Sequence, residues 1–306
     1  NASEVNLNDV SNYSTEFEMN SNTFDNPSSP STLLAGGEGM VDNNYDSSFS
    51  ETTTASFSAD FEIESEDGGD EAVQAYYGFQ IDLNTSFTGE DSLDISIDAG
   101  NGGGSEFDLN STSDALKVDG ISYTFPIGDK TTIFVGDHTD GSALYSTACV
   151  YGGPSNNLDD CGNGSSAIGG GSGTAAGASY EFGDGFAVAV GYTGDGSSTN
   201  GLLTDNGSDS IATQLSYAAD SYGLSVTYAS VEDYSGINDR NFLGLNGYFT
   251  PSDTGAIPSI SVGYEVGDAQ NLSDTSQWFV GLQWDEAGPG TFGTAVGTDG
   301  AITDPD

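Results

Sequence analysis

Apolar and polar side chains alternate at every second position along most of this chain. Between residues 178 and 192, Tyr180 and Phe182 alternate with Ser179 and Glu181, and Phe, Val and Tyr then alternate with Ala and Gly. Successive side chains of a β-strand point to opposite faces, so this period of two predicts strands with one apolar and one polar face. The polar face carries few long side chains, which leaves room beside it for a lumen or for something that fills a lumen.

Thirteen runs of this kind predict about thirteen strands, and helical periodicity is almost absent. The chain is therefore expected to be all-β. The runs span residues 55–64, 73–87, 92–98, 115–125, 131–136, 178–182, 186–192, 210–218, 222–231, 241–249, 257–266, 277–286 and 291–297.

The connections between these runs alternate in length. Short turns lie at 88–91, 126–130, 182–185, 219–221, 251–256 and 286–290, and longer polar links lie at about 99–114, 138–174, 195–209, 232–240 and 268–275. Strands of roughly 8 to 11 residues joined in this way are typical of an antiparallel up-and-down β-barrel with tight turns on one side of a membrane and external loops on the other.

The two faces have a physical reason in such a barrel. The apolar face meets lipid, the polar face lines an aqueous lumen, and aromatic residues near strand ends lie at the level of the lipid headgroups. A soluble β-sandwich, a β-solenoid or a surface-layer module would instead bury the same apolar residues in a core. The regular alternation of loop lengths favours the barrel.

The net charge excludes several partners. The chain has 3 Lys and Arg residues against 48 Asp and Glu residues, which gives a formal net charge of −45. Binding to nucleic-acid phosphates requires clustered Lys and Arg, so no nucleic-acid partner is expected, and adsorption to bare anionic lipid is disfavoured for the same reason. Repulsion of this size is costly without salt or divalent cations, which indicates a saline, extracytoplasmic setting.

The alternating pattern divides the chain into two parts. Residues 1–50 lack it and are expected to form an extended, loop-like segment, whereas residues 51–306 are expected to form the barrel domain. Aromatic residues make up 11% of the chain and are concentrated in the alternating runs, which argues against disorder over most of its length. No run of about eighteen apolar residues is present, so no transmembrane helix is expected.

Cys149 and Cys161 lie in one loop-like stretch, CVYGGPSNNLDDC. In an exported protein such a pair is expected to form a disulfide, and a lone cysteine pair without histidine cannot complete a zinc site. His138 is the only histidine. A catalytic role would require a nucleophile and an orienting acid around it, so we interpret it as a loop histidine and expect no catalytic residue and no enzyme activity.

Other candidate sites are weak. The run GGGSGT at 169–174 lacks the lysine of a phosphate-binding loop and precedes no helix, so it is expected to be external loop. Clusters of Asp, Asn and Gly at 41–46, 156–164 and 204–209 offer oxygen ligands for Ca²⁺, but none has the spacing of an EF-hand. We assign no metal site and no cofactor, and expect only weak, opportunistic Ca²⁺ binding at these acidic loops.

Seven carboxylates fall on the polar phase of their strands and are our candidates for pore-lining residues. Carboxylates along a lumen concentrate cations and repel anions, so they predict a cation preference. The basic residues that offset them are Lys117, Lys130 and Arg240. The alternative is that the acids only keep a wide aqueous wall wetted. The seven are Asp60, Glu62, Asp82, Asp94, Asp98, Glu181 and Glu265.

Four longer stretches carry a family resemblance. They are NLNDVSNYS near the start, DGISYTFPIGDKTTIFVGD, TACVYGGPSNNLDDCGNGSSAIGGGSGTA and QWFVGLQWDEAGPGTFGTAVGT. The first resembles the mature N-terminus, and the others resemble barrel segments, of cyanobacterial outer-membrane porins, particularly of marine forms. The resemblance extends from about residue 50 to 300, and it implies a pore-forming barrel of about sixteen strands for passive passage of ions and small solutes.

The chain departs from this family in two respects. Members usually carry a surface-layer-homology domain after the N-terminal motif, whereas here NYSTEFEMN leads directly towards the barrel. Members also continue through further strands to an aromatic last residue. We therefore expect a porin-type barrel that is incomplete at its C-terminus, with about thirteen of sixteen strands present.

The leading hypothesis is an outer-membrane porin that forms a water-filled, cation-preferring diffusion channel. It is expected to contact outer-membrane lipid and, by analogy with other porins, to form homotrimers. The alternative is a secreted or cell-surface structural β-protein derived from such a barrel. It would assemble through its open sheet edges, which lipid does not tolerate.

Overall fold

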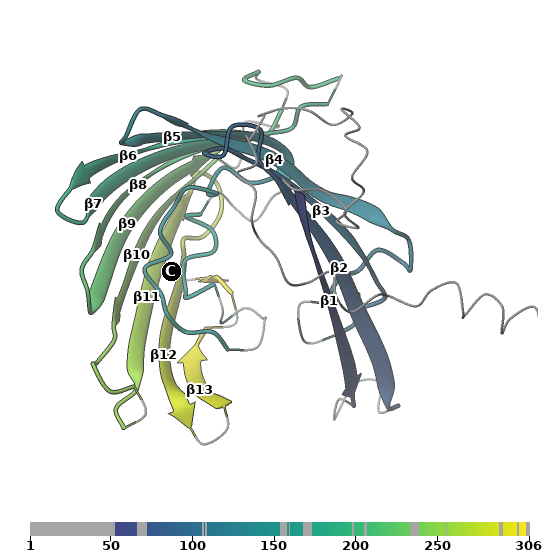
Figure 1. The fold of residues 1–306 in the computed structure, drawn as a ribbon, viewed down its shortest axis with the longest axis vertical. Helices are drawn as coiled ribbons and strands as arrows, with labels where there is room; N and C mark the ends of the chain where they lie inside the picture. Colours follow the sequence, from purple (N-terminus) through teal and green to yellow (C-terminus); the bar gives the residue numbers. More distant parts are fainter. Residues whose placement is uncertain are drawn as a thin grey trace, which may run out of the picture. The chain divides into compact units, whose positions relative to one another are not determined.

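Figure 1 shows the fold of the chain in a computed structural model. The chain divides into two units, Asn1–Met40 and Val41–Asp306, and every described residue belongs to the second. The loop-like segment expected at residues 1–50 lies outside the described residues. The structure describes residues 53–65, 72–105, 107, 109–153, 158, 160–167, 173–197, 199–204, 207–232, 239–254, 256–287, 290–298 and 300–303.

Antiparallel strands make up the secondary structure of these residues, so the all-β prediction is confirmed. Branched and aromatic residues that alternate with small or polar ones form them, because such residues suit a pleated surface with one apolar face. No helix within the described ranges is long and apolar enough to cross a membrane. The strands are β1 (Thr53–Glu64), β2 (Gln74–Thr85), β3 (Ser92–Gly100), β4 (Lys117–Ile127), β5 (Thr131–Thr139), β6 (Gly173–Gly183), β7 (Phe186–Gly194), β8 (Asp209–Ala218), β9 (Tyr222–Val231), β10 (Arg240–Phe249), β11 (Ser259–Ala269), β12 (Thr275–Ala287), β13 (Gly290–Gly297) and β14 (Ile302–Thr303).

One sheet contains all the strands, in the spatial order β1 to β13, with each strand antiparallel to its neighbours in the sequence. The short strand β14 pairs with β12 outside this path. The predicted up-and-down topology and the predicted number of about thirteen strands are thus confirmed. Among the described residues, β1 pairs only with β2 and β13 only with β12, so the sheet is open.

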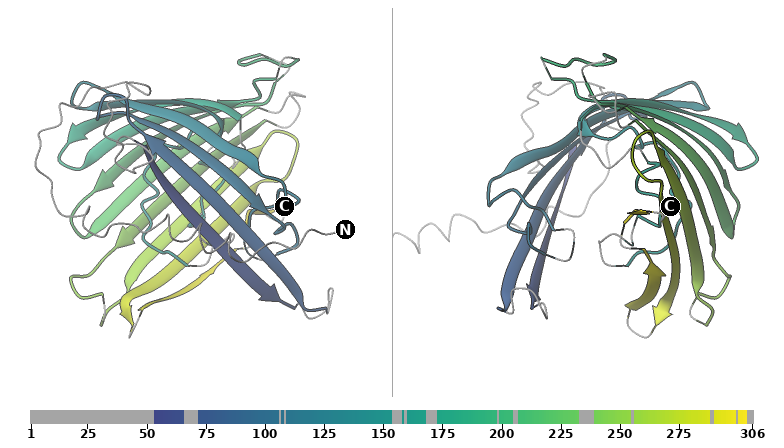
Figure 2. Two further views of the ribbon diagram at one scale, coloured as in Figure 1. Left: turned by 45° about the vertical axis from the view of Figure 1, so that its right-hand side comes forward. Right: turned by 180° about the vertical axis from the view of Figure 1, so that it is seen from behind.

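The sheet is curved, with a concave inner face and a convex outer face (Figures 1 and 2). Register keeps like side chains in line across the outer face: Leu245 lies opposite Val226 and Tyr264, and Tyr264 lies opposite Trp278. These four side chains are 41–48% exposed, although large apolar side chains of soluble proteins are mostly buried. The predicted division of every strand into an apolar and a polar phase is therefore present across the sheet.

Aromatic rings gather on the outer face at the strand ends next to the short turns. Tyr217 lies between Phe186 and Tyr222, with ring centroids 4.6 Å and 5.7 Å away, and Trp284 lies 5.6 Å from Phe292. Tilted aromatic pairs at such distances attract each other. Phe186, Tyr217 and Trp284 thus lie near strand ends, whereas other outer-face aromatics such as Tyr264 lie mid-strand.

From β2 to β10 the connections alternate between short and long, as predicted. The prediction is wrong for the β10–β11 connection, because residues 250–258 form a longer link than its neighbours at 232–239 and 270–274. The turn between β6 and β7 consists of Asp184 and Gly185, both with positive φ (53° and 84°). An Asp-Gly pair favours this two-residue hairpin turn because both residues tolerate positive φ. The next connection towards the N-terminus, between β5 and β6, spans residues 140–172 at the opposite end of the strands.

One carboxylate organises the short turn between β2 and β3. Asp91 Oδ1 accepts hydrogen bonds from the backbone N–H groups of Phe87 (3.0 Å) and Thr88 (2.7 Å). The hydroxyls of Ser86 and Thr88 donate to the same oxygen at 2.7 Å, and the Tyr123 hydroxyl donates to Oδ2 at 2.6 Å. These donors, the Tyr123 hydroxyl foremost, hold the pKa of Asp91 well below its usual range because they stabilise the ionised form.

Replacement of this carboxylate should destabilise the fold in a pH-dependent way. A group with a lowered pKa contributes stability above its unfolded pKa of about 3.9, and that contribution is lost as the pH falls towards the folded pKa. We expect Asp91→Asn to lower the unfolding temperature in detergent by a few degrees at pH 7, and the difference from the parent chain to shrink below about pH 4. Asp129→Asn in the β4–β5 turn is the control. A difference that does not change with pH would contradict this account of the turn.

Candidate functional site

The connection between β5 and β6 follows the inner face of the sheet. We call its described residues, 140–153, 158 and 160–167, the inner segment; Figure 1 shows it in teal on the concave side, beside β10, β11 and β12. The Tyr145 hydroxyl donates a hydrogen bond to the Ala212 carbonyl (2.7 Å), and the Ser146 N–H donates to Gln214 Oε1 (2.6 Å). The first half of the inner segment is thus attached to β8.

Strand β7 has almost no side-chain volume beneath the inner segment. Ala189 is buried, and a Cβ on Gly191 would lie 1.9 Å from the carbonyl oxygen of Gly141. The Gly141 N–H donates to Thr193 Oγ1 at 2.6 Å. A side chain at position 191 would therefore displace the segment. The small residues on the polar face of this strand make room for the inner segment. The sequence pattern predicted free space beside this face, and the inner segment occupies it.

A small apolar cluster holds the same half of the segment. Phe242, Ala212 and Ala229 are buried together on the inner face, and Tyr145 and Val231 pack against them. Burial raises the pKa of the Tyr145 phenol above its ordinary value. A phenol is already protonated at neutral pH at its ordinary pKa of about 10, so the raised pKa keeps Tyr145 a donor to the sheet in more alkaline solution as well.

A disulfide and an asparagine hold the second half of the segment. Cys149 and Cys161 are bonded, with their Cα atoms 6.5 Å apart, which confirms the predicted disulfide. Asn246 Nδ2 donates to the Cys161 carbonyl (2.9 Å), and Asn246 Oδ1 accepts a hydrogen bond from Asn163 Nδ2. A Cβ on Gly263 would lie only 1.6 Å from the Cys161 carbonyl oxygen. The segment thus approaches the backbone of β11 as closely as it approaches that of β7.

Further contacts continue along β11 and β12. The Val150 N–H donates to Ser261 Oγ (2.9 Å), and the Tyr151 ring meets the buried Phe279 ring edge-on at 5.3 Å. Buried backbone groups outside a strand need hydrogen-bond partners, and the inner wall supplies them. The expectation that residues 138–174 form an external loop is therefore wrong for the part that the structure describes.

Glu265 of β11 holds the inner segment by hydrogen bonds from the inner face of the sheet. Its side chain is 2% exposed, and its carboxylate accepts hydrogen bonds from the Ser166 N–H (2.5 Å) and Gln277 Nε2 (2.9 Å). A buried carboxylate requires such donors, because loss of its water shell is otherwise very costly. This predicted pore-lining acid points to the inner side, but it contacts the segment and not open solvent.

The other predicted acids differ in how open they are. Asp60 and Glu181 are exposed, while Asp82 and Asp94 are half-buried and each accepts a hydrogen bond from an amide side chain on β2, at 2.8 and 2.6 Å. Register places all seven on the inner phase of the sheet: Asp60, Glu62, Asp82, Asp94, Asp98, Glu181 and Glu265.

Two of these acids are less accessible than Asp60. Glu62 accepts a hydrogen bond from the hydroxyl of Ser105, in the connection between β3 and β4. Asp98 is 8% exposed and lies opposite Lys117 in the register of β3 and β4. In the wall formed by β1, β2 and β3, Asp60 is therefore exposed, Glu62, Asp82 and Asp94 are half-buried, and Asp98 is buried.

The candidate Ca²⁺ clusters fall largely outside the described residues. The cluster at 41–46 lies wholly outside them, and those at 156–164 and 204–209 are described only in part. Weak Ca²⁺ binding therefore stays a prediction. Within the described part of the chain, no group of three or more His, Cys, Asp or Glu side chains is placed to hold a metal ion. Most of the run at 169–174 is likewise outside the described residues.

Sequence reasoning missed the neutral residues that hold the segment. Gln214 and Asn246 are both buried on the inner face, where each bonds to the inner segment. A signal was available in the sequence, because these are long amide side chains on strands whose other inner positions are mostly small. The partners themselves are 68 and 85 residues away in sequence, so the pattern of one strand does not reveal them.

Comparisons with known proteins identify the fold. No family model and no curated protein matches the sequence. Among solved structures, OprB of Pseudomonas putida matches with a TM-score of 0.56 and 12% identity, over 80% of this chain and 74% of OprB. A mutant porin of Rh. blastica matches with a TM-score of 0.43 and 13% identity, over 81% of this chain and 94% of the porin. A loop-deletion mutant of OmpT, an outer membrane protein of Vibrio cholerae, matches with a TM-score of 0.40 and 14% identity, over 82% and 96%. The likeness to OprB, together with the strand order, confirms the predicted fold class: the sheet is that of a porin-type, up-and-down β-barrel.

Proposed function

We propose that this chain is an outer-membrane porin whose water-filled lumen passes ions and small solutes by diffusion, with a preference for cations. The observation that carries this proposal is the division of one sheet into an apolar, aromatic outer face and a polar, acidic inner face. Lipid suits the first face and water suits the second. The likeness of the fold to OprB supports a location in the outer membrane.

A channel in lipid requires the edges of β1 and β13 to be paired, because backbone polar groups cannot face hydrocarbon without partners. The family resemblance predicts about three further strands, and the proposal takes these to complete the ring. The cyanobacterial origin and the trimer belong to the same proposal and rest on that resemblance.

The inner segment would set the width of the lumen. It occupies part of the concave side, and it is held there by the disulfide, by Asn246 and by the buried Glu265. A segment with this many contacts cannot swing aside without leaving buried polar groups unsatisfied. The constriction is therefore a fixed one.

Cation preference would come mainly from one wall. On the inner side, Asp60 of β1 is exposed and Asp82 of β2 and Asp94 of β3 are half-buried, whereas Glu265 is buried beneath the inner segment. Charges that line a water-filled channel act on passing ions through the local potential. The carboxylates of Asp60, Asp82 and Asp94 should therefore dominate selectivity, and Glu265 should contribute to structure.

Reversal potentials in planar bilayers test this assignment. The full-length protein should favour K⁺ over Cl⁻, and the triple variant Asp60→Asn, Asp82→Asn, Asp94→Asn should lose several-fold in that ratio, because the wall loses its charge. A triple variant with Asp129→Asn, Asp184→Asn and Asp220→Asn, all in short turns, is the matched control and should change the ratio less. Chloride preference in the parent, or an equal effect of both variants, would rule out the carboxylate wall as the source of selectivity.

A charged side chain introduced on the outer face tests whether that face meets lipid. Val226 lies mid-strand on the outer face of β9, so Val226→Arg should destabilise the protein in liposomes by about 2–4 kcal/mol. Ser58→Arg places the same side chain on the exposed inner face of β1 and should cost far less. Unfolding by urea in lipid vesicles measures both. Equal costs at the two positions would mean that the outer face does not meet lipid.

Replacement of Asn246 tests whether the inner segment limits the width of the pore. Asn246→Ala leaves the buried Cys161 carbonyl without its donor, a loss of about 1–3 kcal/mol in local stability. We expect faster amide hydrogen exchange in residues 160–167 and a larger, noisier single-channel conductance. Asn241→Ala removes only an exposed bond to Tyr228 on the other face and serves as the control. Unchanged conductance despite faster exchange would show that the inner segment does not limit the pore.

The secreted structural protein remains the alternative of a different class. A surface polymer would stay soluble without detergent, whereas a lipid-facing barrel would not. Purification in the absence of detergent therefore separates the two, and a soluble, folded product would contradict the porin.

A further inference from the structure

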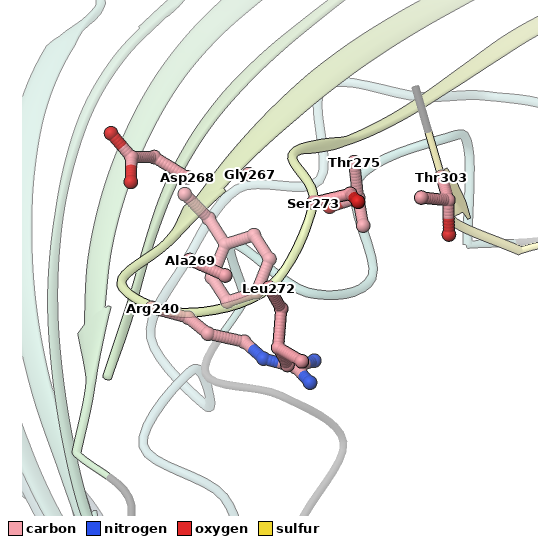
Figure 3. A pocket seen from close by; sticks show the side chains of 9 residues that line it. Arg240, Gly267, Asp268, Ala269, Leu272, Ser273, Thr275 and Thr303 are labelled. Atoms are coloured by element: carbon pink, nitrogen blue, oxygen red, sulfur yellow. The ribbon is translucent and has the colours of Figure 1, made fainter. Parts of the chain in front are cut away.

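A cavity of about 260 Å³ lies where β10 begins and where β11 connects to β12 through residues 270–274 (Figure 3). Phe242, which is buried on the inner face, forms part of its wall, and Leu272 stands beside it. Hydroxyl groups line another side of the cavity. They belong to Ser273, Thr275 and Thr303.

Arg240 also lines this cavity and is the only arginine in the chain. No described residue forms a hydrogen bond or an ion pair with its guanidinium, in a chain that has 48 Asp and Glu residues. Figure 3 shows the guanidinium below Leu272, while the carboxylate of Asp268 points away from it. A planar group with five N–H donors is thus left open to a ligand.

The pairing of the strands fixes the backbone positions of Arg240, Thr275 and Thr303. Arg240 lies in register with Val231 on one side and Ala269 on the other. β14 brings Thr303 opposite Thr275 from a distant part of the chain. Most of the cavity lining is therefore held at strand positions, while Leu272 and Ser273 come from the connection between β11 and β12. A wall that is mostly preformed reduces the entropy lost when a ligand binds.

Gly267 allows the residues of the cavity wall to pack closely against each other. A Cβ on Gly267 would lie 2.5 Å from Thr275 Oγ1 and 2.6 Å from the Phe242 ring. Any side chain there would push the aromatic ring and the hydroxyl apart. The absence of a Cβ at Gly267 lets an apolar surface and a hydroxyl meet beside the guanidinium.

We propose that this cavity is a binding site for a small organic anion that carries one carboxylate on a short apolar body. The guanidinium matches a carboxylate in charge and geometry, and the hydroxyls offer further donors. Phe242 and Leu272 provide contact for the apolar part. The proposal is independent of channel function, because it concerns binding to the folded protein.

The charge of the whole chain gives this site an unusual salt dependence. The excess of Asp and Glu residues repels an approaching anion over long distances, and salt at 0.1 M screens this repulsion beyond about 10 Å. Salt screens the direct contact between the ligand carboxylate and the guanidinium far less. Affinity for the anion should therefore rise between 0.01 M and 0.15 M salt. A simple cationic surface site would show the opposite trend.

Titration of the detergent-solubilised full chain with sodium butyrate, followed by NMR or calorimetry, tests the site. We expect saturable binding, at least tenfold weaker binding in Arg240→Gln, and unchanged binding in the control Lys130→Gln. Butanol, which lacks the charge, should bind at least tenfold more weakly than butyrate. Equal binding in Arg240→Gln, equal binding of butanol, or no saturable binding to the parent chain would overturn the proposal.

A second variant keeps the test decisive if Arg240→Gln does not fold. Arg240→Lys retains the charge but not the planar fork, so it should bind butyrate with an affinity between those of the parent chain and background. Affinity equal to that of the parent chain would show that only a nearby positive charge matters and would overturn the assigned geometry. Because binding is measured without conduction, its failure would leave the channel proposal intact, and the reverse also holds.

Discussion

The close approach of the inner segment to the glycines of the sheet is the contact on which the other features of the inner face depend. The carbonyls of Gly141 and Cys161 lie where a Cβ on Gly191 or Gly263 would otherwise be. Polar residues can then reach the segment backbone from β8, β10 and β11, and the Cys149–Cys161 disulfide lies within reach of the same wall. A wall with ordinary side chains would hold the segment too far away for these hydrogen bonds. The small residues of the polar phase are thus a condition for the position of the inner segment.

The second constraint is register. Side chains on neighbouring strands share a face only while the pairing keeps its phase, and a shift of one residue would exchange the apolar and acidic faces. Register shifts interrupt the pairing of β3 with β4, β5 with β6, β6 with β7 and β12 with β13, but like faces stay on the same side of the sheet. Asp60 and Glu265 therefore share a face although they lie at distant positions in the sheet. The inner segment then gives these two carboxylates different surroundings. It buries Glu265 and leaves Asp60 exposed, so equal sequence patterns lead to a supporting contact at one site and an open charge at the other.

Much of the fold follows from the sequence because it is encoded locally. The period of two identifies the strands and their faces, and turn sequences such as Asp184-Gly185 identify the tight hairpins. The path of the inner segment could not be predicted in the same way, since a polar, glycine-rich stretch suits an external loop as well as an inner wall. Its position depends on partners such as Gln214 and Asn246, which lie far away in sequence. The cavity around Arg240 was hidden for the same reason, because β14 brings Thr303 to it across the sheet.

The central claim is that one sheet separates lipid from water, and its two tryptophans offer the most direct test. Trp278 and Trp284 are the only tryptophans of the chain, and both lie on the outer phase of β12. In reconstituted vesicles the native tryptophan fluorescence reports on this face alone. The account predicts strong quenching by brominated lipids and weak quenching by acrylamide added to the water. Strong quenching by acrylamide with none by brominated lipids would contradict it.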